Sequence, residues 1–242
     1  MKFEKEKFNK ENGKEQISSK ERERVREIER LPLLNEDKVN LLLVWRGLKP
    51  ATNITYVFKE WAPGSPEPIL SPKRKKIRIE ELLQLLGKIG LSAVAEKEFR
   101  LEPEFITENG KQGVLNGMES QMIFVSPSLE TSEELAKNLP EDRSRIEDKN
   151  LGQLFGFPQT AIEAYVKYAK SGFQDEKGII LDNNKLPEEI RNKDYVAFAT
   201  FWLSKDHWQE ELETAKKWAA EIQKLSPNLY AEIVKNWKEH NV

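Results

Sequence analysis

Two different hydrophobic periods divide this chain, and they constrain its fold more than any single residue does. Apolar side chains alternate through Ile54, Tyr56 and Phe58, which is the spacing of a half-buried strand. In the second half they recur every three or four positions, as from Trp208 to Leu225, which is the spacing of an amphipathic helix. The pattern predicts an α+β fold with a small mixed or antiparallel sheet, helices packed on it, and a helix-rich C-terminal half.

The first half contains both kinds of element. Apolar residues at helical spacing predict a helix over 79–89, and Gly90 supplies its C-terminal stop. Alternation predicts a strand over 91–101, and the apolar run 122–125 predicts another. The Asn-Gly pair within 108–113 is a strong turn signal. The apolar run 39–45 is too short for its period to distinguish a buried strand from a core helix.

The second half is predicted to be mainly helical. Thr131 and Glu134 have the spacing of a capping box for a short helix. Two helical pieces are predicted within 150–172, joined at Gly156-Phe157-Pro158. The segment 195–203 is apolar on both faces, which favours a central strand covered on both sides. Two further helices follow it, the first capped by Ser204 and the second beginning at Ser226-Pro227.

A highly charged N-terminal extension precedes the body. Residues 1–17 are poor in large apolar side chains, which predicts a mobile tail. Ser18 and Glu21 then form a possible capping box for a helix with a narrow apolar stripe, ended by Pro32. We therefore divide the chain into an extension, 1–30, and a globular body, 31–242. A weak boundary within the body is possible at the charged stretch 141–150.

The absence of cysteine excludes several kinds of chemistry. The 242 residues contain no Cys and two His, so disulfides, thiolate nucleophiles, Fe–S clusters, Cys-ligated zinc and an all-protein His₃ metal site are ruled out. His207 and Glu211 lie one helical turn apart, but two ligands on one turn make a weak metal site, and polar residues are ordinary there. We predict no metal and no cofactor.

Residues 151–165, LGQLFGFPQTAIEAY, form the most distinctive segment. It resembles a small prokaryotic domain of unknown function, the DUF483-like group, whose pattern reads roughly LGxLxGYPxCCVxxF. The resemblance brings no established activity, and Thr160 and Ala161 replace the paired cysteines of that pattern. The alternative interpretation is purely structural: Gly156 permits a helix-ending conformation and Pro158 starts the next helix.

Two cationic segments are candidate binding sites. Arg46 and Lys49 flank a Gly-Pro turn after an apolar run and can hold a phosphate or carboxylate, although cations at the end of an element are often only solvated. Gly156 and Pro158 are taken with them as candidate ligand-binding residues. The run Lys73, Arg74, Lys75 and Lys76 can contact a nucleic-acid backbone or an acidic partner. It lacks interleaved aromatic residues, so a solvated helix start is the alternative.

The function expected from these observations is that of a non-enzymatic binding or scaffold protein with a protein partner. The net charge of −2 provides no global field for nucleic acid or an anionic membrane. No run approaches the length of a membrane-spanning helix and the N-terminus lacks a signal-peptide pattern, so a cytoplasmic location is expected. The alternatives are an enzyme acting on an anionic small molecule, or a nucleic-acid-associated protein using residues 73–78. Of the six Trp residues, Trp61 is expected to be the exposed one.

Overall fold

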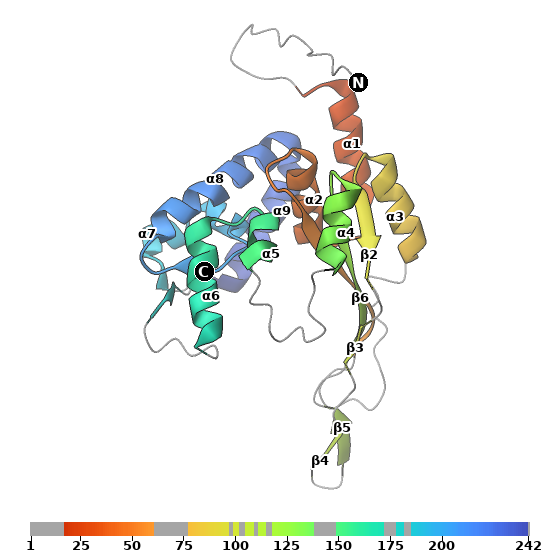
Figure 1. Cartoon of the computed structure of the whole chain (residues 1–242). Coiled ribbons are helices and arrows are strands. Elements are labelled where there is room, and N and C mark those ends of the chain that lie inside the picture. Colours follow the sequence, from red (N-terminus) through yellow and green to blue (C-terminus); the bar gives the residue numbers. More distant parts are fainter. Residues whose placement is uncertain are drawn as a thin grey trace, which may run out of the picture.

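The computed structural model describes residues 17–60, 77–96, 99–101, 105–108, 111–114, 118–137, 149–171, 178–181 and 185–241. Within these ranges the chain is α+β, with a small antiparallel sheet and helices packed on it, as predicted (Figure 1). No helix in the described part of the chain is both long enough and apolar enough to cross a membrane.

The sheet is organised around a long central strand, β6 (Met118–Ser126). It pairs on one side with β1 (Thr52–Glu60), and on the other with β2 (Ser92–Ala95) and β3 (Phe99–Leu101), all antiparallel. Strands β4 (Phe105–Glu108) and β5 (Lys111–Val114) form a separate two-stranded pair beyond the end of the sheet (Figure 1). The strands predicted near 54–58 and 122–125 are thereby confirmed, and the single strand predicted over 91–101 is found as two strands, β2 and β3.

Helices cover both faces of β6, so its consecutive side chains are buried. Ile123 and Val125 belong to the main core, which includes α1 (Ser19–Arg30), α2 (Asn35–Trp45) and α3 (Ile79–Lys88). Phe124 faces the other way, into a small cluster with Leu135 of α4 (Leu129–Lys137) and residues of α5 (Lys149–Leu154). This double cover explains why the strand reads as an apolar run rather than as an alternating pattern.

The second half of the chain is built mainly from helices. After α5 come α6 (Gln159–Lys170), the short α7 (Glu188–Arg191), α8 (Trp208–Leu225) and α9 (Pro227–Asn241). A two-residue strand β7 (Ile180–Leu181) pairs with β8 (Leu203–Ser204). The buried stripe of α8 is as predicted at Leu212, Ala215, Ala219, Ile222 and Leu225, and it also includes Trp218.

Three structural predictions are corrected or resolved. The run 39–45 belongs to a helix, because its residues are buried all round between the sheet and α8 and α9. The segment 195–203 is not a central strand. It forms the 3₁₀ helix η3 (Asp194–Phe198), in which Val196 and Phe198 are buried, followed by an irregular stretch. Helix α4 begins at Leu129, before the predicted capping box, and the backbone N–H of Thr131 donates to Ser128 Oγ at 3.4 Å.

Most of the predicted tail 1–17 and of the predicted boundary 141–150 lies outside the described residues, as do the loop containing Trp61 and the cationic run 73–76. The second part of the extension is described. It is the predicted helix α1 with a complete Ser18–Glu21 capping box. Its narrow apolar stripe is buried in the main core through Val25 and Ile28. The charged helix is therefore packed on the body.

Candidate functional site

The corner between α5 and α6 is set by a glycine and a proline. Gly156 has φ +72°, its N–H donates to Gln153 O at 2.9 Å, and Phe157 N–H donates to Gly152 O at 3.0 Å. This pair of bonds is the Schellman arrangement, in which glycine avoids the strain that a Cβ would bring. Pro158 follows as the N-cap residue of α6, with φ −56°. The structural interpretation of the Gly-Phe-Pro segment is therefore sufficient for its backbone.

This corner packs directly on the turn that follows α2. The N–H of Ala51 donates to Leu154 O at 2.8 Å, which ties the start of β1 to the end of α5. A Cβ on Gly156 would lie 3.1 Å from Pro50 Cδ and 3.4 Å from Lys49 Cα. The two segments thus touch through their backbones. Residues that are more than a hundred positions apart in the sequence meet here, and Lys49 is placed beside Gly156.

Next to the corner lies an apolar cavity of about 260 Å³, which we call the corner cavity. Its lining comes from α5, the corner, α6 and the segment after η3: Leu151, Gly152, Phe155, Phe157, Ala161, Ile162, Tyr165, Val166, Thr200, Phe201 and Trp202. Five of these residues are aromatic, and none of the described lining residues is Asp, Glu, His, Lys or Arg. Such a surface binds apolar rings by contact and desolvation rather than by charge.

The hydroxyl-bearing residues of the lining lie on different elements. Tyr165 is on α6, and Thr200 is on the segment that follows η3. Burial, followed by the neighbouring Tyr168, raises the pKa of Tyr165, so its phenol is neutral at physiological pH. The Trp202 side chain is 54% exposed, and its ring lies 6.1 Å from that of Tyr168, measured between centroids. We place Trp202 at the rim of the cavity.

Lys49 is the most unusual cation in the described part of the chain. It is only 2% exposed, and its Nζ donates to Asn40 Oδ1 at 2.7 Å and to Thr200 Oγ1 at 3.5 Å. The same nitrogen lies 4.5 Å from the centroid of the Trp218 ring and 5.3 Å from that of Phe157. Burial lowers the pKa of Lys49 from 10.5 to about 7, because the charged amine loses its water.

This amine lies directly behind the wall of the corner cavity. Phe157 and Thr200 line the cavity on one side and contact Lys49 Nζ with the same side chains. The aromatic contacts continue inward, since the Phe157 ring is 5.6 Å from that of Phe201 and the Phe201 ring is 5.8 Å from that of Trp218. The cavity and the buried amine therefore share one aromatic framework.

Arg46 lies in a different environment from Lys49. Its guanidinium binds Glu21 of α1 through Nη1 and Glu221 of α8 through Nε, both at 2.7 Å. Its Cζ also lies 5.7 Å from the centroid of the Trp45 ring. Two carboxylates already neutralise this cation, and it does not line the corner cavity. The structure gives Arg46 the role of a tie between α1 and α8.

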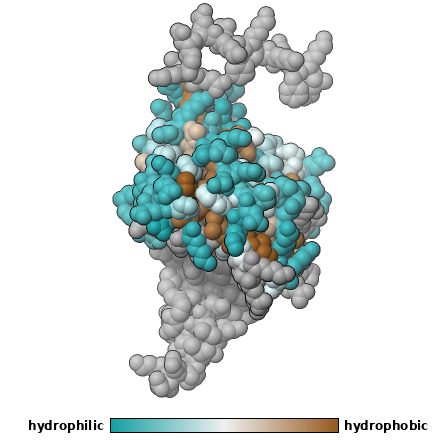
Figure 2. Space-filling model, turned by 90° about the vertical axis from the view of Figure 1, so that its left-hand side faces the viewer, coloured by the Kyte–Doolittle hydropathy of each residue, from teal (hydrophilic) through white to brown (hydrophobic). Residues whose placement is uncertain are grey.

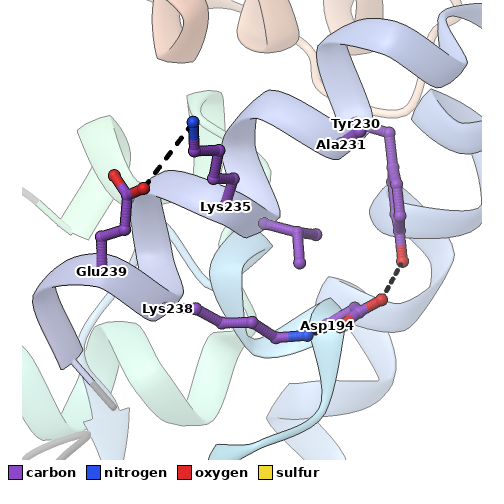
Figure 3. Close-up of a pocket in the computed structure, with 7 residues that line it drawn as sticks. Asp194, Tyr230, Ala231, Lys235, Lys238 and Glu239 are labelled. Atoms are coloured by element: carbon purple, nitrogen blue, oxygen red, sulfur yellow. Dashed lines mark hydrogen bonds and ion pairs between the residues drawn. The ribbon is translucent and has the colours of Figure 1, made fainter.

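A second hollow lies on the surface between η3 and α9 (Figure 3). Its charged groups are paired with one another: Asp194 accepts from Lys238 at 2.7 Å and from Tyr230 at 3.4 Å, and Lys235 lies 3.7 Å from Glu239. Burial, followed by the Asp194 charge, raises the pKa of Tyr230. The hollow is open and its polar groups have partners, so it offers less to a ligand than the corner cavity.

The residues weighed as a metal site take structural roles. Glu211 is buried, and its carboxylate accepts from the N–H of Ser204 at 2.7 Å and from its hydroxyl at 2.6 Å. The Ser204 hydroxyl in turn accepts from the N–H of His207 at 3.0 Å, which orders the turn before α8. Among the described residues, no group of three or more His, Asp or Glu side chains is placed to hold a metal ion.

The structure thus brings together Lys49 and Gly156, and it separates both from Arg46. Pro158 adjoins the cavity as the N-cap of α6 but does not line it. Sequence reasoning missed the lining residues Thr200 and Trp202, because they fall in the segment predicted as a central strand. The signal present in the sequence was the set of aromatic residues in 151–165, because this segment supplies much of the cavity wall.

Comparison with known proteins adds no relative from which a function can be transferred: no protein-family model, no curated protein and no solved structure matches the chain.

Proposed function

We propose that this is a non-enzymatic binding protein that holds a ring-sized apolar group of its ligand in the corner cavity. The observation that carries the proposal is the lining itself, with five aromatic residues around about 260 Å³. Apolar clefts with a few well-placed polar groups are the usual form of a small-molecule site. Tyr165 and Thr200 are the polar groups available to orient a ligand here.

The size of the cavity narrows the class of ligand. A dry apolar cavity of about 150 Å³ takes up benzene, whereas sites for drug-sized molecules begin at about 300 Å³. A cavity of about 260 Å³ lies between these values and suits a group of one or two fused rings. A whole nucleotide would exceed it.

The enzyme alternative finds less support in this geometry. A general base or nucleophile must reach the reacting atom, and the part of the lining that the structure describes has no Asp, Glu or His. Lys49 is a candidate amine, but the side chains of Phe157 and Thr200 stand between it and the cavity. The nucleic-acid alternative rests on residues 73–78, most of which lie outside the described residues.

The surface also favours a small ligand over a broad apolar protein interface. On the face shown in Figure 2, apolar residues form separate spots within a mainly hydrophilic surface. Large contiguous apolar patches are what mark hydrophobic protein interfaces. A protein partner, expected from the charged extension, would then bind through polar contacts or through one inserted aromatic side chain.

The test is direct titration with a neutral two-ring probe. We expect 1-naphthamide to bind the full-length protein, measured by isothermal titration calorimetry. V166F adds a ring at the cavity wall and is expected to lower the affinity for the probe by at least about tenfold, because the new ring occupies the space that the probe needs. L129F adds the same ring at a 54% exposed position of α4 and is expected to bind like the wild type.

Circular dichroism and thermal melting establish that V166F is folded before its binding is interpreted. Probe binding that is equal in wild type and folded V166F would place the ligand elsewhere. No binding of the probe to the wild type at millimolar concentration would refute the proposed function.

A further inference from the structure

Lys49, behind the wall of the corner cavity, is a cation without a counter-ion among the described residues. Among the described residues, no carboxylate forms an ion pair with Lys49, and the groups that contact its Nζ are Asn40, Thr200 and two aromatic rings. Arg46, by contrast, lies only three residues before Lys49 in the sequence and has two carboxylate partners. A buried charge without an opposite charge is costly, because amide and ring contacts only partly replace its water.

Thr200 connects this cation to the cavity. Its Oγ1 accepts from Lys49 Nζ at 3.5 Å, which leaves the hydroxyl hydrogen free to donate to a ligand. Thr200 is exposed and lines the cavity, so an acceptor atom inside the cavity can reach this hydroxyl. An anionic acceptor bound there would lie close enough to Lys49 to stabilise the charged form of its amine.

We propose that the ligand of the corner cavity is a small aromatic carboxylate, whose ring fills the apolar part and whose carboxylate binds Thr200 and supplies the counter-ion of Lys49. This inference rests on the proposed binding function and adds to it the chemical class of the ligand. The aromatic lining recognises the ring, and the pair of Thr200 and Lys49 recognises the acid.

The groups that face Lys49 do not interfere with this role. From α2 it meets Asn40, from α8 Trp218, from the corner Phe157, and from the segment after η3 Thr200, none of which changes charge near neutral pH. Glu221 lies one turn beyond Trp218 on α8 and is bound to Arg46. Tyr165, in the cavity lining, stays neutral because its pKa is raised.

The inference predicts that binding depends on pH. In the ligand-free protein the pKa of Lys49 is about 7, so the amine is largely charged at pH 6 and largely neutral at pH 9. A carboxylate ligand that requires the charged amine should lose affinity by up to about tenfold for each pH unit above about 7. A neutral ligand of the same shape should show no such loss.

The experiment compares 1-naphthoate with 1-naphthamide by calorimetry on the full-length protein between pH 6 and 9. We expect naphthoate to bind at least about tenfold more tightly than the amide at pH 6, and this preference to disappear by pH 9. Repeating the titration in buffers of different ionisation enthalpy should show proton uptake on naphthoate binding near pH 8.

Two lysine variants separate the role of the amine from a general charge effect. K49M keeps an unbranched side chain, one atom shorter than lysine, without its charge, and it is expected to abolish the preference for naphthoate while retaining naphthamide binding. K217M removes an exposed lysine of the same helix that carries Trp218 and is expected to leave both ligands unchanged. The proton-uptake measurement uses only the wild type, so it decides the question even if K49M fails to fold.

The outcomes distinguish the two proposals. If naphthamide and naphthoate bind equally at all pH values, without proton uptake, the ligand class is wrong and the binding function survives. If K49M keeps the preference for naphthoate, Lys49 is not its origin. If neither compound binds the wild type, the proposed function fails and this inference fails with it.

Discussion

At the scale of single residues, Lys49 shows how burial changes an ordinary surface group. Its position after a helix and beside Gly-Leu and Pro suggests an exposed anion-binding cation. Packing instead places it between α2, α8 and the α5–α6 corner, with 2% of its surface exposed. When the amine of a lysine buried in this way is charged and has no counter-ion, it destabilises the folded protein.

Lys49 should therefore make stability depend on pH in a specific direction. Its pKa is about 7 in the folded protein and 10.5 in the unfolded chain, so the unfolded chain binds more protons between these values. The free energy of unfolding should consequently rise with pH across this window, by an amount on the order of 4 kcal/mol. Urea denaturation at pH 7 and pH 10 measures the rise.

K49M supplies the control for this prediction. Without the amine, position 49 contributes equally to stability at both pH values. The increase in the free energy of unfolding between pH 7 and pH 10 should therefore be smaller in K49M by the Lys49 contribution, since all other titrating groups are the same in the two proteins. At pH 7 the variant should be more stable than the wild type. Parallel stability profiles for the two proteins would show that the Lys49 amine is not the group that titrates.

Gly156 is a second residue whose role depends on its tertiary neighbours. Gly156 and Gly47 both have φ +72° and both end a helix, but a Cβ at Gly47 would meet nothing within 4 Å. G47A should therefore cost about 1 kcal/mol for the backbone conformation alone. G156A adds the close approach to Pro50 and Lys49 and should cost at least about 1 kcal/mol more. Urea denaturation of both variants tests the difference, and equal losses would contradict the close packing.

At the scale of elements, α1 is held on the body by more than its apolar stripe. Arg46 binds Glu21 in the first turn of α1 and Glu221 on α8, so one guanidinium joins two helices. Hydrogen bonds from Ser18 and then the Arg46 charge lower the pKa of Glu21, as expected for a capping carboxylate. The attachment of α1 should therefore be sensitive to position 46.

R46M tests this attachment. We expect faster amide hydrogen exchange across residues 19–30 and a loss of stability of roughly 1 kcal/mol, since both ion pairs are partly exposed. R26M removes an exposed arginine of α1 itself and should change neither quantity. Unchanged exchange in R46M would mean that the apolar stripe alone holds the helix.

Elements with a clear hydrophobic period were predicted well, and the wrong prediction of a strand over 195–203 has a physical cause. The stripes of α3, α8 and α9 lie where their helical spacing places them, because an amphipathic pattern has only one way to face a core. The segment 195–203 is apolar without a usable period. Its strand assignment needed a partner strand on each side, and in the described part of the chain the one pairing is that of β7 with β8, at the far end of the segment. Local sequence does not specify that neighbour.

At the scale of the whole molecule, one sheet is enclosed by helices from both halves of the chain. The N-terminal helix belongs to this enclosure, because Val25 is 4% exposed and Ile28 is fully buried in the main core. The corner cavity forms where the two halves meet, with Lys49 from the first half and its lining from the second.

Truncation tests the division of the N-terminal extension. Deleting residues 1–30 removes the buried part of α1 and should cost about 3 kcal/mol or more, since two large apolar side chains leave the core. Deleting residues 1–16 alone should leave the melting temperature unchanged, as the sequence predicts for a mobile tail. Differential scanning calorimetry measures both. Equal melting temperatures for the two truncations would show that α1 contributes little to the core.

The sequence by itself determined the fold class, the positions of most helices and strands, the capping box of α1 and the turn at Gly156, because each depends on local conformation or on one hydrophobic period. It also ruled out thiol and His₃ metal chemistry. Only the tertiary structure decided that the run 39–45 is a helix, that 195–203 is not a strand, and that Lys49 is buried beside an aromatic cavity. Those outcomes depend on tertiary contacts, such as those of α2 with α8 and α9, of η3 with α8 and α9, and of Lys49 with Thr200, and no local pattern encodes them.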